Sequence, residues 1–223
     1  MLNVVFHHKP VEAKDGFLYI NNTKSPLDHR MFSEIAGFKI LFDMIEKGEI
    51  KDDWISLNHY RREMDSDCTG RIYIPEPMIL PCSVGQNYDL CHNIDDLILC
   101  GQVMKETHPH LVPWFENVIN GRMFIPYNMG VMPTSQFKDY FTFLITVLSK
   151  FMEKINVKTY EDMLERVKLN GKYKGHQDDR VEYQARIPSF LAERLSTLYW
   201  IFCSKQCPIF PAKVNLLEEG QKI

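Results

Sequence analysis

The chain has 223 residues, of which 45% are hydrophobic and 25% are charged, and its formal net charge is −3. This is the composition of a folded globular protein rather than of a disordered one, and we predict a single domain over residues 1–223. A slightly acidic balance gives no overall field to attract a polyanion, so we expect no nucleic-acid partner.

Six cysteines are scattered along the chain, and its start does not have the pattern of a signal peptide. We therefore expect reduced thiols and a cytoplasmic protein. The longest apolar run is far shorter than the roughly 20 residues that span a bilayer. Any membrane contact is expected to be peripheral, at the inner face of the membrane.

The first predicted elements place polar residues directly after strands. Residues 2–6 are apolar and β-branched, which indicates a buried strand that leads into a loop. Residues 32–47 carry apolar side chains at helical spacing and stop at Gly48, which predicts an amphipathic helix. Residues 54–57 predict a second strand, and the segment 58–62 follows its carboxyl end. Ligands of open α/β sheets bind at that end of the strands.

The later patterns are mainly helical. They predict helices over 94–106, 111–120, 135–154, 160–170 and 189–203, with Ser135 as the cap of the third. Residues 71–80 carry prolines and predict an edge strand or an extended loop. Residues 122–133 predict a strand, a tight turn and a strand. The chain from Pro208 onward has a weak pattern, and the alternation of strands with helices predicts an α/β fold.

The segment Asn58-His59-Tyr60-Arg61-Arg62 is the first candidate binding site. Two guanidinium groups beside an imidazole and a phenol can hold a diphosphate through bidentate, charge-assisted hydrogen bonds. The two arginines can equally be surface cations that pair with the acidic residues just after them, Glu63, Asp65 and Asp67. The spacing alone does not separate these alternatives.

Two acidic stretches are candidate metal or acid–base sites. Asp65-Ser66-Asp67 has the D-x-D arrangement that holds Mn²⁺ or Mg²⁺ between carboxylates and a diphosphate, although an ordinary solvated loop has the same pattern. Asp178 and Asp179 lie in a polar loop, where they can bind a metal, act on an acceptor hydroxyl or cap the next helix. The residues leave these choices open.

Two further segments are candidates for contact with the ligand. The turn at 127–132 brings the amide of Asn128 beside Gly130, which suits either the hydroxyls of a sugar or tight packing. Arg186, Glu193 and Arg194 accompany the start of the last predicted helix, and such a helix amino terminus can hold an anion. Glu193 also suits the helix dipole without any other role.

Four stretches, taken together and in order, resemble a known family. They are His8-Lys9 after the first strand, WISLNHYRR at 54–62, YNMGVM at 127–132 and RIPSFLAERL at 186–195. This set resembles the bacterial capsular-polysaccharide-locus family of proposed glycosyltransferases, catalogued as a domain of unknown function. The HYRR element and the FLAERL helix are its most specific parts.

The resemblance implies a GT-A-like nucleotide-sugar-binding fold, with a mixed central sheet flanked by helices. It implies transfer of a sugar from a nucleotide-sugar donor to a surface polysaccharide, with a glycan or lipid-linked glycan as acceptor. The donor-binding residues would be His8, Lys9, Asn58, His59, Tyr60, Arg61, Arg62, Asn128, Gly130, Arg186 and Arg194. The catalytic residues would be Asp178, Asp179 and Glu193, and Asp65 with Asp67 would hold Mn²⁺ or Mg²⁺. The alternative is a non-catalytic protein that binds a sugar nucleotide or a polysaccharide in an assembly complex.

Overall fold

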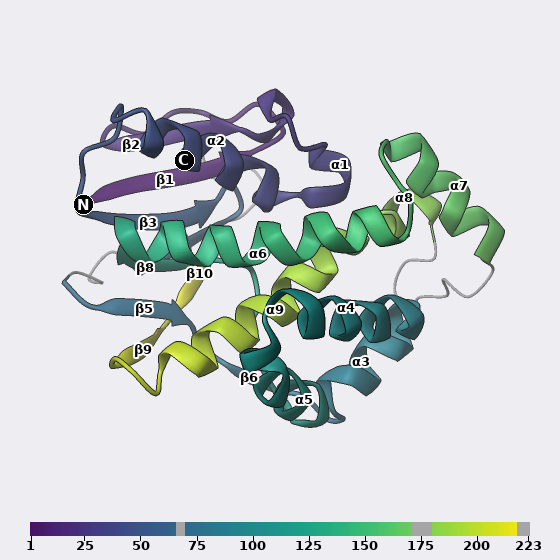
Figure 1. The fold of residues 1–223 in the computed structure, drawn as a ribbon. Coiled ribbons are helices and arrows are strands. Elements are labelled where there is room, and N and C mark those ends of the chain that lie inside the picture. Colours follow the sequence, from purple (N-terminus) through teal and green to yellow (C-terminus); the bar gives the residue numbers. More distant parts are fainter. Residues whose placement is uncertain (66–69, 171–179, 218–223) are drawn as a thin grey trace.

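The computed structural model describes residues 1–65, 70–170 and 180–217. In this part of the chain, strands and helices form an α/β fold in which helices flank a mixed central sheet (Figure 1). The predicted fold class is therefore confirmed. None of the described helices combines the length with the apolar character that a membrane crossing needs.

Three parallel strands form the part of the sheet that carries the site. β1 (Leu2–His7) lies between β2 (Phe17–Asn21) and β3 (Trp54–His59), and it pairs with both in parallel. The carboxyl ends of the three strands consequently meet at one edge of the sheet. β1 and β3 were both predicted, but β3 continues to His59, so Asn58 and His59 belong to the strand rather than to the loop after it.

The sheet continues beyond β3 through strands that come from later parts of the chain. β8 (Gly130–Pro133) runs antiparallel to β3 and to β5 (Ile72–Pro75), and β5 pairs in parallel with β9 (Ile209–Ala212). β4 (Arg62–Met64) folds back from the end of β3 and pairs with β10 (Val214–Leu216). A separate ribbon joins β6 (Met78–Ile79) to β7 (Met123–Phe124).

Two predictions about the strands were wrong. β5 is not an edge strand, since β8 and β9 pair with its two sides. The prolines allow this because Pro75 is the last residue of β5 and the others lie outside it. Residues 209–216 form two strands where no element was predicted.

The helices that were predicted begin and end close to the expected positions. They are α2 (Glu34–Glu46), α4 (Ile94–Thr107), α5 (Val112–Asn120), α6 (Thr134–Lys154), α7 (Tyr160–Asn170) and α9 (Ile187–Cys203). Three further helices were not predicted, namely α1 (His29–Phe32), α3 (Val84–Cys91) and α8 (Val181–Gln184). Short 3-10 turns lie at Asn22–Lys24 and Pro109–Leu111. Ser135 does not cap α6, because the helix already includes Thr134.

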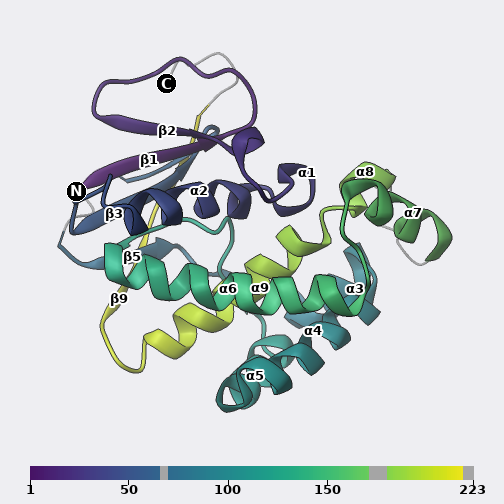
Figure 2. The same ribbon diagram turned by 45° about the horizontal axis from the view of Figure 1, so that its top comes forward.

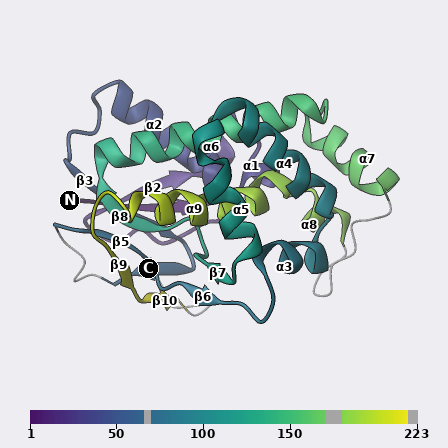
Figure 3. The same cartoon turned by 60° about the horizontal axis from the view of Figure 1, so that its bottom comes forward.

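α9 is the central helix of the molecule. Almost its whole length is buried, and it packs against α1, α5 and α6. Figure 2 shows α9 between the sheet and the helices α3, α4 and α5, and Figure 3 shows α6 crossing the molecule beside it. α2 and α6 in turn contact the strands β1, β3 and β8. Because α9 starts at the edge where β1 and β3 end, its first residues face the carboxyl ends of those strands.

Candidate functional site

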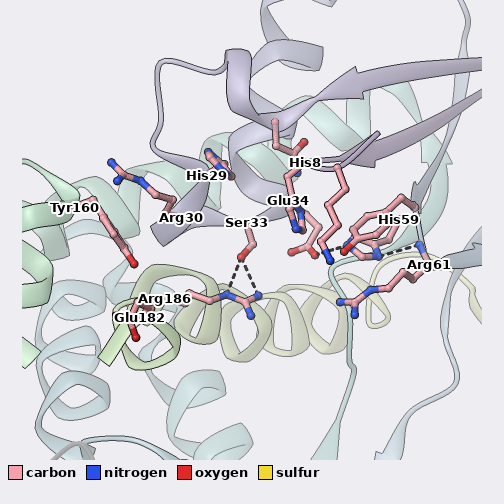
Figure 4. Close-up of a pocket in the computed structure, with 13 residues that line it drawn as sticks. His8, His29, Arg30, Ser33, Glu34, His59, Arg61, Tyr160, Glu182 and Arg186 are labelled. Carbon is pink, nitrogen blue, oxygen red and sulfur yellow. Dashed lines mark hydrogen bonds and ion pairs between the residues drawn. The ribbon is translucent and has the colours of Figure 1, made fainter. Parts of the chain in front are cut away.

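A cleft with two adjoining chambers lies at this edge, and Figure 4 shows the residues that line the first of them. The chambers share Glu34, His59, Arg61 and Arg186. The first chamber, of about 370 Å³, is also lined by His8, Lys9, Asn22, His29, Arg30, Ser33, Tyr60, Tyr160 and Glu182. The second chamber, of about 480 Å³, is also lined by Arg62, Met78, Leu80, Asn87, Cys91, His92, Phe124, Tyr127, Tyr183, Ser189, Phe190, Glu193 and Arg194. Arg186 and Arg61 reach the cleft from opposite sides, with Glu34 between them.

The HYRR segment turns a corner at the middle of the cleft. His59 ends β3 beside Phe6 of β1, and the Tyr60 N–H donates to the Phe6 carbonyl at 3.1 Å. The chain then reverses, so that Arg62 begins β4 and pairs with β10. The Leu217 N–H donates to the Arg61 carbonyl at 2.9 Å. The segment is thus fixed by its backbone on both sides, and its side chains line the cleft.

His59 is buried and has a defined tautomer. Its Nδ1 accepts a hydrogen bond from the Arg61 N–H at 3.2 Å, which leaves the ring proton on Nε2. Nε2 lies 3.3 Å from Oε1 of Glu34. Burial, and then the charges of Arg61 and Arg62, lower the pKa of His59 to about 3. At neutral pH the imidazole is uncharged, and it contacts both the HYRR turn and Glu34 of α2.

Glu34 is a site residue that the sequence did not reveal. It is the first residue of α2, and its side chain faces the cleft with 20% of its surface exposed. Burial raises its pKa, and the charge of Glu193 acts in the same direction, while Arg186 and Arg62 lower it. Two carboxylates therefore influence each other across the second chamber.

Three arginines in the cleft lie against rings or a hydroxyl instead of carboxylates. The guanidinium of Arg61 is 5.2 Å from the ring of Tyr60, and that of Arg62 is 4.4 Å from the ring of Tyr127. Arg186 donates to the Ser33 hydroxyl through Nε and Nη2, at 3.1 and 2.9 Å. Within the described residues, no carboxylate forms an ion pair with any of these three arginines.

This arrangement bears on the two alternatives for Arg61 and Arg62. Glu63, one of the expected surface partners, pairs with Lys14 at 3.6 Å instead. Asp65 lines a different cavity, of about 180 Å³, together with Lys14 and Asn58. Asp67, the third expected partner, lies outside the described residues. Within the described part of the chain the two arginines are cations at a cleft, an arrangement that suits an anionic ligand.

His8 and Lys9 follow β1 and line the first chamber, as their place after the strand suggests. The ring of His8 meets the ring of Tyr60 edge to face at 5.1 Å. Burial, and then the neighbouring cations beginning with His29, lower the pKa of His8 to about 4. At neutral pH His8 is therefore uncharged, as His59 is.

Glu193 and Arg194 lie in the second chamber but differ in exposure. Arg194 is 5% exposed, and it donates to the carbonyl of Phe190 and to Asn87. It also holds Oε2 of Glu193 at 3.2 Å, and the Tyr127 N–H donates to Oε1 of Glu193 at 3.3 Å. Arg194 is thus part of the framework, and Glu193 is a carboxylate oriented toward the cleft.

Three residues predicted to bind the donor lie outside the lining of both chambers. Asn58 points to the opposite face of β3, where its Oδ1 accepts from the Met64 N–H at 2.9 Å. Asn128 is buried and accepts from the Ser196 hydroxyl. A Cβ on Gly130 would lie 2.9 Å from the Tyr73 carbonyl, so glycine lets β8 approach β5. The contacts of all three are those of packing.

The predicted metal site receives no support from the described residues. Among them, no group of three or more His, Cys, Asp or Glu side chains could hold a metal ion. Asp65 lies on the other face of the sheet, and Asp67, Asp178 and Asp179 lie outside the described residues. Any role of these three aspartates stays a prediction.

Asn22 is another lining residue that the sequence did not indicate. Its side chain is 2% exposed and has no hydrogen-bond partner among the described residues. It lies after β2, close to Gly37, where a Cβ would collide with its Oδ1 and with Phe6. A buried amide without a partner in the chain is a candidate to bind a ligand.

One of the comparisons with known proteins, that with solved structures, agrees with this fold. Residues 70–169 match the family model described as a domain of unknown function (DUF4422), which is less than half of the chain and excludes the HYRR turn and α9. No protein with curated annotation matches. The apo structure of WbbM, a bifunctional glycosyltransferase, superposes with a TM-score of 0.71 at 14% identity. The match covers 98% of this chain and 45% of that one, so the chain spans less than half of WbbM. The fold of this chain is that of a glycosyltransferase structure.

Proposed function

We propose that this chain is a glycosyltransferase that binds a nucleotide-sugar donor in the cleft and transfers its sugar to a glycan or lipid-linked glycan acceptor. The fold that it shares with WbbM supports the class of activity. The observation that carries the proposal is the convergence of Arg61, Arg62 and Arg186, without carboxylate partners among the described residues, at the carboxyl ends of parallel strands.

Sugar transfer breaks the bond between the anomeric carbon and the diphosphate, and negative charge develops on the leaving diphosphate. Guanidinium groups that are already positioned stabilise this charge in the transition state without reorganising. Two of the three arginines are held by the HYRR turn and the third by Ser33. The acceptor hydroxyl loses a proton as it attacks, and Glu193, open to the second chamber, is the described carboxylate best placed to take it.

Glu34 is the second candidate for this base, because its side chain is less exposed than that of Glu193, at 20% against 26%. Mn²⁺ or Mg²⁺ has no step in this proposal, since the described residues do not form a site for it. The ligands of a metal ion at the diphosphate would include residues outside the described part of the chain.

Binding and turnover can be tested in one experiment. The protein is screened for thermal stabilisation by a panel of nucleotide sugars and nucleoside diphosphates, with and without Mn²⁺ or Mg²⁺, and hydrolysis of each stabilising donor is then measured. Stabilisation by at least one donor, together with its slow hydrolysis, is expected. Stabilisation by no member of the panel would overturn the proposal, and binding without any release would favour the non-catalytic alternative.

Glu193→Gln separates catalysis from binding. The amide keeps the size of the side chain and can still contact the Tyr127 N–H, so donor affinity should stay within about threefold. Hydrolysis should fall by about 100-fold or more, as is usual when a general base is lost. Asp89→Asn is a matched control, because Asp89 is exposed on α3 and does not line the cleft. Normal turnover by Glu193→Gln would remove Glu193 from the mechanism.

A further inference from the structure

Ser33 has a backbone conformation that is unusual for a residue with a side chain. Its φ is 49° and its ψ is −123°, and it joins α1 to α2 as the C-cap of one helix and the N-cap of the other. Glycine adopts this region readily, whereas a Cβ makes it costly. Such strain persists where the surrounding structure holds it, and it is frequent at functional sites.

The hydroxyl of Ser33 also fails to do what serine usually does at the start of a helix. An N-cap serine normally accepts a hydrogen bond from the first turn, as Ser83 does from the Gln86 N–H at 3.1 Å in α3. At Ser33 there is no such bond to α2. The hydroxyl accepts instead from Nε and Nη2 of Arg186, more than 150 positions away in the chain.

Arg186 is the residue that gains from this arrangement. Its guanidinium is 5.6 Å from the rings of both Tyr183 and Phe190, and it lines both chambers of the cleft. Two of its five N–H groups are used by Ser33, and the other three have no hydrogen bond to a described residue, so they are available for a ligand. Figure 4 shows the two bonds side by side, which fixes the plane of the guanidinium as well as its position.

We propose that Ser33 is a positioning residue, whose strained backbone holds its hydroxyl where it orients Arg186 toward the diphosphate of the donor. This inference rests on the proposed function for its ligand. At the α1–α2 junction the Ser33 hydroxyl does not cap α2 and the backbone of Ser33 is strained. Both features serve to fix the guanidinium of Arg186. Ser33 itself touches Arg186 and not the reacting atoms.

The test compares Ser33→Ala, Ser33→Gly and Ser83→Ala. Calorimetric titrations use uridine, guanosine, adenosine and cytidine diphosphates in turn. We expect both Ser33 variants to bind the preferred diphosphate about tenfold more weakly, because Arg186 keeps its charge but loses its orientation. Ser33→Gly should also unfold at a higher temperature than Ser33→Ala, since both lack the hydroxyl and glycine relieves the strain. Ser83→Ala should lower the unfolding temperature through its lost cap and leave the affinity unchanged.

A double-mutant cycle tests the route of the effect. In an Arg186→Ala background, Ser33→Ala should cause no further loss of affinity, because the group that it positions is absent. Independent, additive losses would overturn the inference, since Ser33 would then act on the ligand by another route.

A measurement without ligand keeps this inference distinct from the proposed function. With ¹⁵N-labelled arginine, the Nε–H signal of Arg186, identified by its absence in Arg186→Lys, should exchange slowly with water in the wild type. It should exchange as fast as a free arginine in both Ser33 variants and stay slow in Ser83→Ala. If no diphosphate binds the wild type, the proposed function fails and the exchange data alone decide whether Ser33 holds Arg186. Slow exchange in Ser33→Ala would contradict that it does.

Discussion

Arg61 and Arg62 in the cleft differ from Arg166, outside it, in what surrounds the charge. The cleft arginines lie against aromatic rings, at 5.2 and 4.4 Å. Arg166 donates to Asp96, a completely buried carboxylate, at 2.8 Å. A cation beside a ring keeps its hydrogen-bonding capacity for a ligand, whereas a cation beside a buried carboxylate neutralises a charge of the fold. We therefore expect the same residue type to serve binding in one region and stability in the other.

The largest effect is expected for Arg61→Ala combined with Arg62→Ala. Each lost charge-assisted hydrogen bond costs about 2 kcal/mol, so the double variant should bind the donor diphosphate about 1000-fold more weakly. The free energy of unfolding should change little, because neither arginine balances a carboxylate among the described residues. Calorimetric titration and denaturant unfolding measure the two quantities.

Arg71→Ala is the matched control for this variant. Arg71 also lies against a ring, 5.0 Å from the centre of Phe210, but it does not line the cleft. Its replacement should leave donor affinity unchanged. Normal binding by the Arg61 and Arg62 double variant would show that the HYRR turn is structural and that the ligand site lies elsewhere.

Arg166→Ala should give the opposite result. Removal of one partner of a buried ion pair leaves an unbalanced charge, which typically costs about 3 kcal/mol of unfolding free energy. Donor affinity should be that of the wild type, since Arg166 is not among the residues that line the cleft. A loss of affinity without a loss of stability would contradict the expectation that Arg166 serves stability and the cleft arginines serve binding.

Acidification should destabilise the fold through His59 and His92. Both are buried and both have a pKa of about 3 in the folded chain, against 6.5 for a free side chain, with burial as the main cause. Between these values the unfolded chain binds more protons, so stability falls as the pH drops from about 6.5 toward about 3. The slope is at most about 1.4 kcal/mol per pH unit for each histidine.

Glu34 opposes this trend, because its raised pKa lets the folded chain take up a proton before the unfolded one does. His59→Gln and His92→Gln should each flatten the slope in denaturant unfolding measured between pH 4 and 7. An unchanged slope in both variants would show that these histidines do not take up protons on unfolding.

Local sequence patterns predicted β1, β3 and most helices, because each of these buries an apolar face with its own periodicity. β9 and β10 escaped prediction, since Pro211 and Lys213 interrupt the pattern and the strands depend on distant partners. Position within a strand also decided which residues reach the cleft. The prediction ended β3 at Leu57, and the two-residue period of the longer strand turns Asn58 away from the face of His59.

The remaining site residues could not be predicted from local patterns. Asn22, Ser33 and Glu34 are ordinary polar residues in the sequence, and they acquire a role through contacts with distant segments. Ser33 meets Arg186 because α2 and α9 start at the same edge of the sheet. A search for positive-φ residues next to charged ones could find such positions once a backbone is known.

The pairing of β4 with β10 also has a consequence for synthesis of the protein. The backbone partners of Arg61 and Arg62 are residues 216 and 217, which the ribosome adds long after the two arginines. A nascent chain exposes its HYRR turn with one flank unsupported until this last described strand has emerged. The proposed diphosphate-binding site is therefore expected to form only at the end of translation. A chain that stalls before residue 214 should fold much of its core but lack a formed donor site.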